Sequence, residues 1–165
     1  MSLSHFSAAE VQAVGASLQN PENLGNREDV EFQWAIKASN HAETYFNLIT
    51  SVDPSALRLT NRDDEIYNQF RTEFKDFKVD VIDVEELKSA EAKIKWREFC
   101  ESFKDMDNYN YGSLLRIDCK KDYTESNSIF ALRIQFLAIE IARNREGYNA
   151  DLRKTKGIVN DSKDS

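Results

Sequence analysis

The stretch IFALRIQFLAIEIARNREG, from Ile129 to Gly147, carries the strongest structural signal in the chain. Apolar side chains cover most of the circumference that this stretch would have as a helix, whereas a surface helix keeps only one apolar stripe. We therefore expect a helix that runs through the centre of a domain. Gly147 is expected to end it, because glycine readily adopts the left-handed conformation that follows a helix C-terminus.

The segments before this helix also show helical periodicity. Five Gly and two Pro in 165 residues leave few breaks, which favours long helices over many short strands. We expect long helices over residues 28–51, 60–77 and 83–104. Thr60 and Asp83 are the expected N-caps of the last two. Between the first two, Asp53-Pro54 is expected to cap a short turn of helix.

The chain divides into three parts by composition. Residues 1–27 are expected to form a short N-terminal helix and a linker, and residues 28–150 a helix-rich globular domain. The polar residues 151–165 are expected to be a disordered tail.

Two short segments alternate apolar and polar residues, as strands do. They are residues 78–82, in which Val79 and Val81 should point the same way, and residues 114–119. The helix between them favours a parallel crossover, although antiparallel pairing stays open. The sequence therefore predicts an α+β, predominantly helical fold, with about five helices and a small two-stranded sheet in a single domain.

Composition limits the classes of function. The chain has 22 Lys and Arg against 29 Asp and Glu, a net charge of −7, which disfavours nucleic-acid binding and favours a basic partner or simply solubility. No apolar run approaches the roughly 18 residues of a membrane span, and the first ten residues do not resemble a secretory signal. Cys100 and Cys119 form no C-x-x-C pair, which favours a reducing compartment. We therefore expect a cytoplasmic monomer that does not bind membranes.

Residues that could carry catalysis are few. The chain has neither a nucleotide-binding glycine motif nor a G-x-S-x-G motif, and only His5 and His41 supply imidazoles. His41 is expected to lie at a packing boundary rather than to bind a metal. The acidic pairs at 63–64 and 85–86 fall in first turns of helices, where negative charge stabilises the helix dipole. We expect no catalytic residues, no metal and no cofactor.

Two segments could recognise a partner. The loop 107–112 carries Tyr109 and Tyr111, which either form a recognition surface or cover the core. Near the end of the last helix, Arg143 and Arg145 either stabilise the helix C-terminus or anchor a carboxylate of a partner.

Four stretches of the chain resemble one known family, the polysaccharide biosynthesis domain-containing proteins of eukaryotes. They are WAIKASNHAETYFNLITSVDPSALRLT (34–60), residues 66–100 ending in DVEELKSAEAKIKWREFC, YNYGSLLRIDC (109–119) and NSIFALRIQFLAIEIARNREGYN (127–149). The one departure is Val84, where the family pattern leads us to expect proline before the paired glutamates.

The resemblance implies a small cytosolic protein that acts in the biogenesis of translation elongation factor 1 alpha. It implies a non-catalytic, ATP-independent chaperone that holds the nascent GTP-binding domain of that factor. Two alternatives stay open: a carbohydrate-metabolism enzyme with two facing acids, and a passive adaptor subunit.

We expect five side chains to contact the partner, and we expect joint substitution of the two arginines to weaken binding with little change in the melting curve. The five are Tyr109, Tyr111, Arg143, Arg145 and Tyr148.

Overall fold

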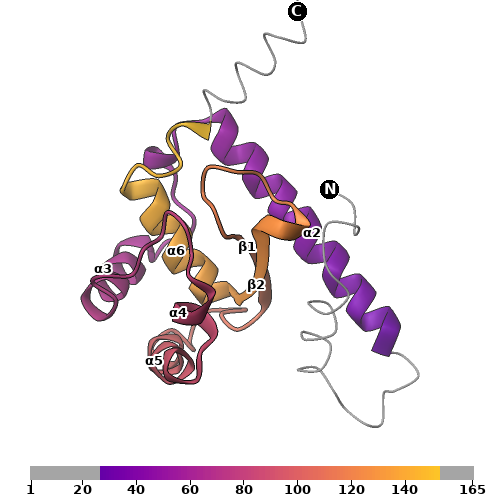
Figure 1. The fold of residues 1–165 in the computed structure, drawn as a ribbon, viewed down its shortest axis with the longest axis horizontal. Helices are drawn as coiled ribbons and strands as arrows, with labels where there is room; N and C mark the ends of the chain where they lie inside the picture. The colour runs from indigo at the N-terminus through magenta and orange to yellow at the C-terminus, as the bar shows by residue number, and fades with distance from the viewer. Residues whose placement is uncertain (1–26, 153–165) are drawn as a thin grey trace, which may run out of the picture.

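Helix α6, which spans Arg133–Arg145, runs through the centre of the molecule (Figure 1). The computed structural model describes residues 27–152, with side chains from residue 33 onward. Every side chain of α6 from Ile134 to Asn144 is buried, which confirms the predicted central helix. Gly147 follows α6 with a φ of 88°, and the N–H of Tyr148 donates to the carbonyl of Arg143 at 2.9 Å. This is the Schellman pattern of a helix that ends at a glycine.

The other helices surround α6. They are α2 (Arg27–Ser51), the short 3₁₀ helix η3 (Pro54–Ala56), α3 (Asp63–Glu73), α4 (Val84–Lys88) and α5 (Ala90–Glu101). The prediction for α2 is confirmed by its bounds. The predicted turn after it is also confirmed, because the carboxylate of Asp53 accepts a hydrogen bond from the N–H of Ser55. Within residues 27–152 the fold is thus the predicted one, with five α-helices and a small two-stranded sheet.

Two of the predicted helices are shorter than expected. Thr60 does not cap α3: instead, the buried carboxylate of Asp63 accepts hydrogen bonds from the N–H groups of Leu59 and Thr60, both at 2.7 Å. These bonds stabilise a turn ahead of the helix, so α3 begins later than expected. The helix expected over residues 83–104 is divided at Ser89, which ends α4 and whose hydroxyl caps α5 by accepting from the N–H of Ala92 at 3.1 Å.

The sheet contains one predicted strand and one that the sequence did not predict. Strand β1 (Gly112–Arg116) pairs antiparallel with β2 (Ser128–Leu132), which follows the short 3₁₀ helix η4 (Glu125–Asn127). The first residues of the run expected to be helix are therefore strand. A short run of consecutive apolar residues fits a buried strand and a buried helix equally well. Pairing with β1 decides in favour of the strand.

The segment predicted as a strand over residues 78–82 makes a single antiparallel bridge, from Val81 to Asp118. Val79 is 1% exposed and Val81 is 52% exposed, so the two side chains do not share one face as expected. The parallel crossover is also wrong, because the sheet and this bridge are both antiparallel.

The elements form two groups on either side of α6. Figure 1 shows α2 and the two strands on one side and α3, α4 and α5 on the other. An aromatic core lies between α3, α5 and α6. In it the rings of Phe74 and Trp96 stack with their centroids 4.2 Å apart, and Phe70 and Phe99 lie beside them. Stacked and edge-on ring pairs of this kind stabilise a core beyond the area they bury.

The ends of the chain extend past the described part. The predicted N-terminal helix, the linker after it and the chain beyond residue 152 lie outside the described residues. Leu152 is buried against the main core, so the globular part continues into the first residues of the predicted tail.

Replacing Phe99 by alanine should destabilise the fold strongly. Phe99 is fully buried, and removing a buried phenylalanine ring costs about 3–5 kcal/mol. Ile94 on the same helix is 62% exposed, so Ile94→Ala should change the free energy of unfolding by less than about 0.5 kcal/mol. Urea unfolding of both variants measures the difference, and equal costs would contradict this packing.

Candidate partner-binding site

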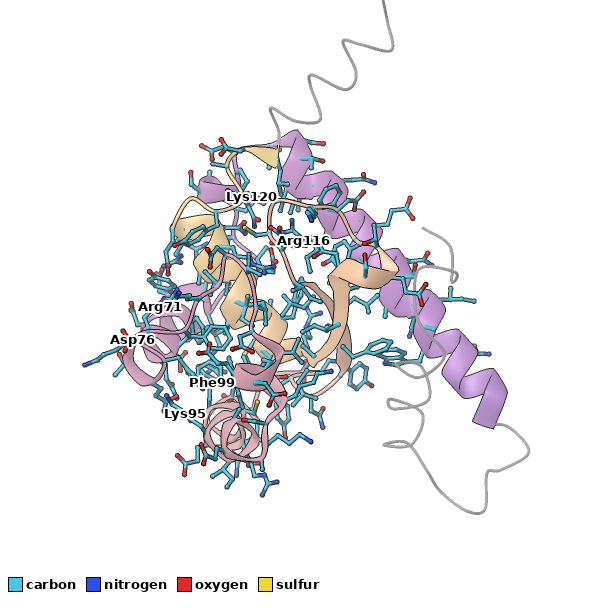
Figure 2. The ribbon with its side chains drawn as sticks, viewed as in Figure 1. Arg71, Asp76, Lys95, Phe99, Arg116 and Lys120 are labelled. Carbon is cyan, nitrogen blue, oxygen red and sulfur yellow. The ribbon has the colours of Figure 1, made fainter. Side chains whose placement is uncertain are left out.

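A buried ion cluster occupies the interior beside the second half of α6. The carboxylate of Glu140 accepts hydrogen bonds from Arg143 at 2.7 Å and from Arg116, on β1, at 3.3 Å. The hydroxyl of Tyr45, on α2, donates to it at 2.7 Å, and the amide of Asn149 donates at 3.1 Å. All five side chains are buried. Figure 2 places Arg116 in the interior, between α6 and α2.

The two arginines keep Glu140 ionised. Burial alone would raise the pKa of this carboxyl group, but the charges of Arg116 and Arg143 and the hydrogen bond from Tyr45 outweigh burial and hold the pKa at about 2. A buried carboxylate is tolerated only when its charge is compensated and its oxygens accept hydrogen bonds, and both conditions hold here.

Arg143 belongs to this cluster and not to the surface. Its guanidinium is completely buried and donates to the backbone carbonyls of Val79, Arg116 and Ile117 at 2.6, 2.8 and 3.1 Å. The expectation that Arg143 contacts a partner is therefore corrected. Its position near the end of α6 directs it inward, where it joins the segment around Val79 and the end of β1 to the central helix.

Arg145 and Tyr148 do lie at the surface, Arg145 as the last residue of α6 and Tyr148 just after it. Arg145 forms an exposed ion pair with Asp64 at 2.6 Å, and its guanidinium lies 5.3 Å from the centroid of the Tyr67 ring. Tyr148 is 40% exposed and lines a small polar depression. Its neighbour in that depression is the ion pair between Arg71 and Glu146, at 2.7 Å.

The loop that carries the other two tyrosines is held by the opposite end of α6. Asn108 has a φ of 61°, a left-handed conformation that asparagine tolerates better than most residues. The carbonyls of Tyr109 and Tyr111 accept hydrogen bonds from the N–H groups of Ile134 and Arg133, at 2.9 and 2.7 Å. The loop thereby satisfies N–H groups that a helix leaves without partners at its N-terminus.

The two tyrosines of this loop differ in exposure. Tyr109 is half-buried and packs against the core, whereas Tyr111 is 61% exposed. Of the two interpretations that the sequence left open, Tyr109 fits the covering role and Tyr111 fits a recognition surface.

Tyr109 and Tyr111 border a wide groove between α2 and α5, with a volume of about 1700 Å³. We call this feature the aromatic groove. Its lining is mainly apolar, with charged side chains among the apolar ones. The apolar and aromatic lining residues are Trp34, Ile36, Ala38, Leu87, Trp96, Tyr109, Tyr111, Phe130, Ala131 and Leu132.

The α2 wall of the groove depends on a close contact between Trp34 and β1. The Trp34 ring packs against the Phe130 ring with centroids 4.7 Å apart. A Cβ atom on Gly112 would lie only 2.1 Å from an atom of the Trp34 indole. Glycine at this position therefore lets the indole approach the strand backbone, and any side chain would have to displace it.

The described residues that line the groove include one carboxylate, one thiol and one imidazole. Glu101 is the one carboxylate among the described residues that line it, so the groove lacks the two facing acids that the carbohydrate-enzyme alternative requires. Cys100 is a buried free thiol, and burial raises its pKa to about 11, so it stays protonated at neutral pH. His41 packs edge-on against Phe136, as expected for a packing boundary. Its pKa is lowered by burial and by the charge of Arg133.

Two kinds of feature are absent from residues 27–152. No group of three or more His, Cys, Asp or Glu side chains in this part of the chain is arranged to hold a metal ion. Within the same residues, no helix has the length and apolar character needed to cross a membrane.

The structure thus separates the five predicted contact residues. Tyr109 and Tyr111 lie at the N-terminal end of α6, and Arg145 and Tyr148 lie near its other end, about 20 Å away by the rise of a 13-residue helix. Arg143 is buried between them. Sequence reasoning missed most of the groove, including Trp34 and Leu132, because its walls come from elements far apart in the chain. The consecutive apolar residues 129–132 were the one available signal, and they fit a buried strand and a buried helix equally well.

Most of the chain is similar in sequence to proteins of one family. The family model described as PBDC1 protein matches residues 30–154. The chain is 56% identical over 144 residues to the Protein PBDC1 of Mus musculus, covering 86% of this chain and 73% of that protein. It is 55% identical to the Homo sapiens protein, of which it spans 62%. The Protein PBDC1 homolog of Saccharomyces cerevisiae is 47% identical over 79% of this chain and 92% of its own length.

A solved structure has the same fold. It is the solution NMR structure of protein yst0336 from Saccharomyces cerevisiae, 44% identical in sequence, with a TM-score of 0.72. The alignment covers 84% of this chain and 98% of that one.

Arg143 and Arg145 should respond differently to substitution by alanine. Arg143→Ala leaves Glu140 in the interior with one fewer cation, and breaking a buried pair costs about 3–5 kcal/mol. Arg145→Ala removes an exposed pair worth less than about 1 kcal/mol. Chemical unfolding separates the two. A small change in the free energy of unfolding for Arg143→Ala would contradict a stabilising role for this guanidinium.

Stability at acid pH should depend on Glu140. Because its pKa is about 2 in the folded protein against an ordinary 4.5, its ionisation stabilises the fold fully above pH 4.5 and progressively less towards pH 2. Glu140→Gln should therefore be costly at pH 7 and much less costly at pH 3. Unfolding free energies measured over this range, with the exposed Glu85→Gln as control, test the claim. A cost that does not change with pH would contradict it.

Proposed function

We propose that this chain is a non-catalytic, ATP-independent chaperone in the cytoplasm. The chain belongs to the PBDC1 protein family and carries the aromatic groove, and both support this proposal. The chain's proposed client is the nascent GTP-binding domain of translation elongation factor 1 alpha. The resemblance of the sequence to the family implies this client. The observation that carries a binding role is the groove itself, a wide concave surface with apolar and aromatic side chains open to solvent.

The groove has the properties that a holder of unfinished chains needs. An incomplete domain exposes apolar surface that aggregates unless it is covered. Tyr111, Ile36 and Leu132 each remain more than a third exposed around the groove and can cover such a surface. Binding that favours one state of the client needs no nucleotide, because it shifts the folding equilibrium by mass action. This agrees with a sequence that has no nucleotide-binding glycine motif.

The groove is supported by the rigid centre of the molecule. Its loop is tied to the first turn of α6 by two backbone hydrogen bonds, and Trp34 is seated on β1. A surface held in this way binds with a smaller entropy cost than one that must first become ordered. The proposed monomer can therefore offer the groove without a large rearrangement.

Tyr111 should matter for capture of the client, and Tyr148 should not. Both are exposed tyrosines, but only Tyr111 lines the groove. In a pull-down from actively translating extract, the unaltered protein should enrich nascent elongation factor and release it when GTP is added. Tyr111→Ser should reduce the recovery at least about fivefold, the loss of roughly 1 kcal/mol at a well-packed interface position. Tyr148→Ser should leave it unchanged.

Other results of the pull-down would decide against this proposal. Recovery of a stable complex without elongation factor, unaffected by GTP, would favour the passive adaptor. Loss of capture with Tyr148→Ser alone would move the binding surface to the other end of α6.

A further inference from the structure

The aromatic groove has the opposite charge balance to the chain as a whole. The chain carries 22 Lys and Arg against 29 Asp and Glu. Among the described residues, the groove is lined by five basic side chains and one acidic one, Glu101. The basic residues are Lys37, Lys88, Lys93, Arg97 and Arg133. The groove is therefore a local cationic surface on an acidic protein.

The cations come from both walls of the groove. Lys37 lies on α2, Lys93 and Arg97 are four residues apart on one face of α5, and Arg133 begins α6. The other faces of α5 are directed elsewhere. Phe99 is buried, and the ammonium of Lys95 lies 4.4 Å from the centroid of the Phe74 ring (Figure 2). A segment lying in the groove would have an apolar floor beneath it and positive charge on either side.

Four of these five cations form no ion pair with a described carboxylate. Within residues 33–152, none of Lys37, Lys93, Arg97 and Arg133 forms an ion pair. Three arginines at other places on the surface do form ion pairs. Arg62 pairs with Glu65 and Asp105, Arg71 with Glu146, and Arg145 with Asp64. Cations that converge on an apolar groove without internal partners attract a ligand of opposite charge.

From this arrangement we infer that the aromatic groove binds an acidic amphipathic protein segment, with large apolar side chains on one face and Asp or Glu beside them. This inference rests on the proposed function and specifies which part of a client the groove selects. The apolar side chains would pack against Ile36, Tyr111 and Leu132, which line the groove and are each more than a third exposed. The carboxylates would pair with Lys37 on one wall and with Arg97 on the other.

The size of the groove fits a short segment. A helix is about 10 Å wide and rises 1.5 Å per residue, so some ten residues fill a volume on the order of 1200 Å³. The groove, at about 1700 Å³ and open to solvent, admits a segment of this length. Amphipathic segments that lie in apolar grooves are a common mode of peptide recognition.

A nucleic acid fits the same groove less well. Basic and aromatic side chains together can bind single strands, but such sites follow the phosphate backbone along an extended cationic surface. Here the cations are confined to one concavity on a chain of net charge −7, which repels a long polyanion outside the groove. A short acidic protein segment meets only the local charge.

Binding of designed peptides to the full chain tests this inference. The probe is a fluorescein-labelled 15-residue peptide with Leu and Phe on one helical face and Asp and Glu on the other, and its control has Lys in place of every acid. Fluorescence anisotropy should show that the acidic peptide binds at least tenfold more tightly than its control. The affinity should fall as salt is raised, because salt screens the ion pairs.

Charge reversal locates the binding. Lys93→Glu with Arg97→Glu should weaken binding of the acidic peptide at least tenfold. The control, Lys75→Glu with Lys78→Glu, changes the net charge equally at exposed positions outside the groove and should have less than a twofold effect. Equal losses in both pairs would overturn the inference, since the attraction would then be due to net charge alone. Circular dichroism of each pair confirms that it is folded.

Three further results would also overturn the inference. One is displacement of the peptide by single-stranded RNA at equal concentration. The second is tight binding of the basic control peptide. The third is a dimer in sedimentation that Lys93→Glu with Arg97→Glu dissociates, since the groove would then hold a second copy of this chain.

Failure of this inference can be told apart from failure of the proposed function. If elongation factor is captured from translating extract but the acidic peptide does not bind, the chaperone role holds and the charge preference is wrong. If the peptide binds at the groove but no elongation factor is captured, the charge preference holds and the proposed client is wrong.

Discussion

The ionised Glu140, buried beside α6, is the constraint on which the rest of the fold depends. A carboxylate can remain in the interior only if cations and hydrogen-bond donors surround it. The two guanidinium groups and the Tyr45 hydroxyl that do so come from α6, β1 and α2, so meeting this requirement fixes three elements relative to one another. Arg143 extends the constraint, because its remaining donors bind the carbonyls of Val79, Arg116 and Ile117. A two-stranded sheet alone is only marginally stable, and this cluster joins it to the helices.

The two ends of α6 have different roles: one supports the core, and the other supports an exposed surface. Its buried second half holds the ion cluster, and the first turn holds the loop of Tyr109 and Tyr111 through backbone hydrogen bonds. A surface built on the end of a buried helix is rigid without being part of the core. The groove can therefore expose Ile36, Tyr111 and Leu132, while buried side chains of its lining, such as Trp96, also belong to the core. Substitutions at Tyr111 or Arg97 should accordingly change binding more than stability.

Much of the fold follows from the sequence, for physical reasons that can be named. The long apolar run predicted the central helix, and Gly147 marked its end because a left-handed residue is needed there. The second strand was missed because a buried strand and a buried helix share an apolar pattern, and only pairing with β1 distinguishes them. The break at Ser89 was missed because its hydroxyl caps α5 in the middle of a stretch with continuous helical periodicity.

The candidate site was less accessible to sequence reasoning. Exposure of Tyr111 and burial of Arg143 depend on which way each element faces in the assembled fold, and spacing along the chain does not give that. The reversed charge of the groove likewise appears only when α2, α5 and the start of α6 are brought together. The net charge of the chain favours a basic partner surface, whereas the cations of the groove favour an acidic segment. Both can hold for one client, because long-range attraction and local recognition involve different surfaces.

Hydrogen–deuterium exchange of the full chain, with and without the nascent GTP-binding domain of the elongation factor, tests the central claim most directly. Binding in the aromatic groove predicts slower exchange in residues 108–113, in α5 and in the first turn of α6, with no change around residues 145–148. Protection confined to residues 145–148, or no protection at all, would contradict the assignment of the groove as the client-binding surface.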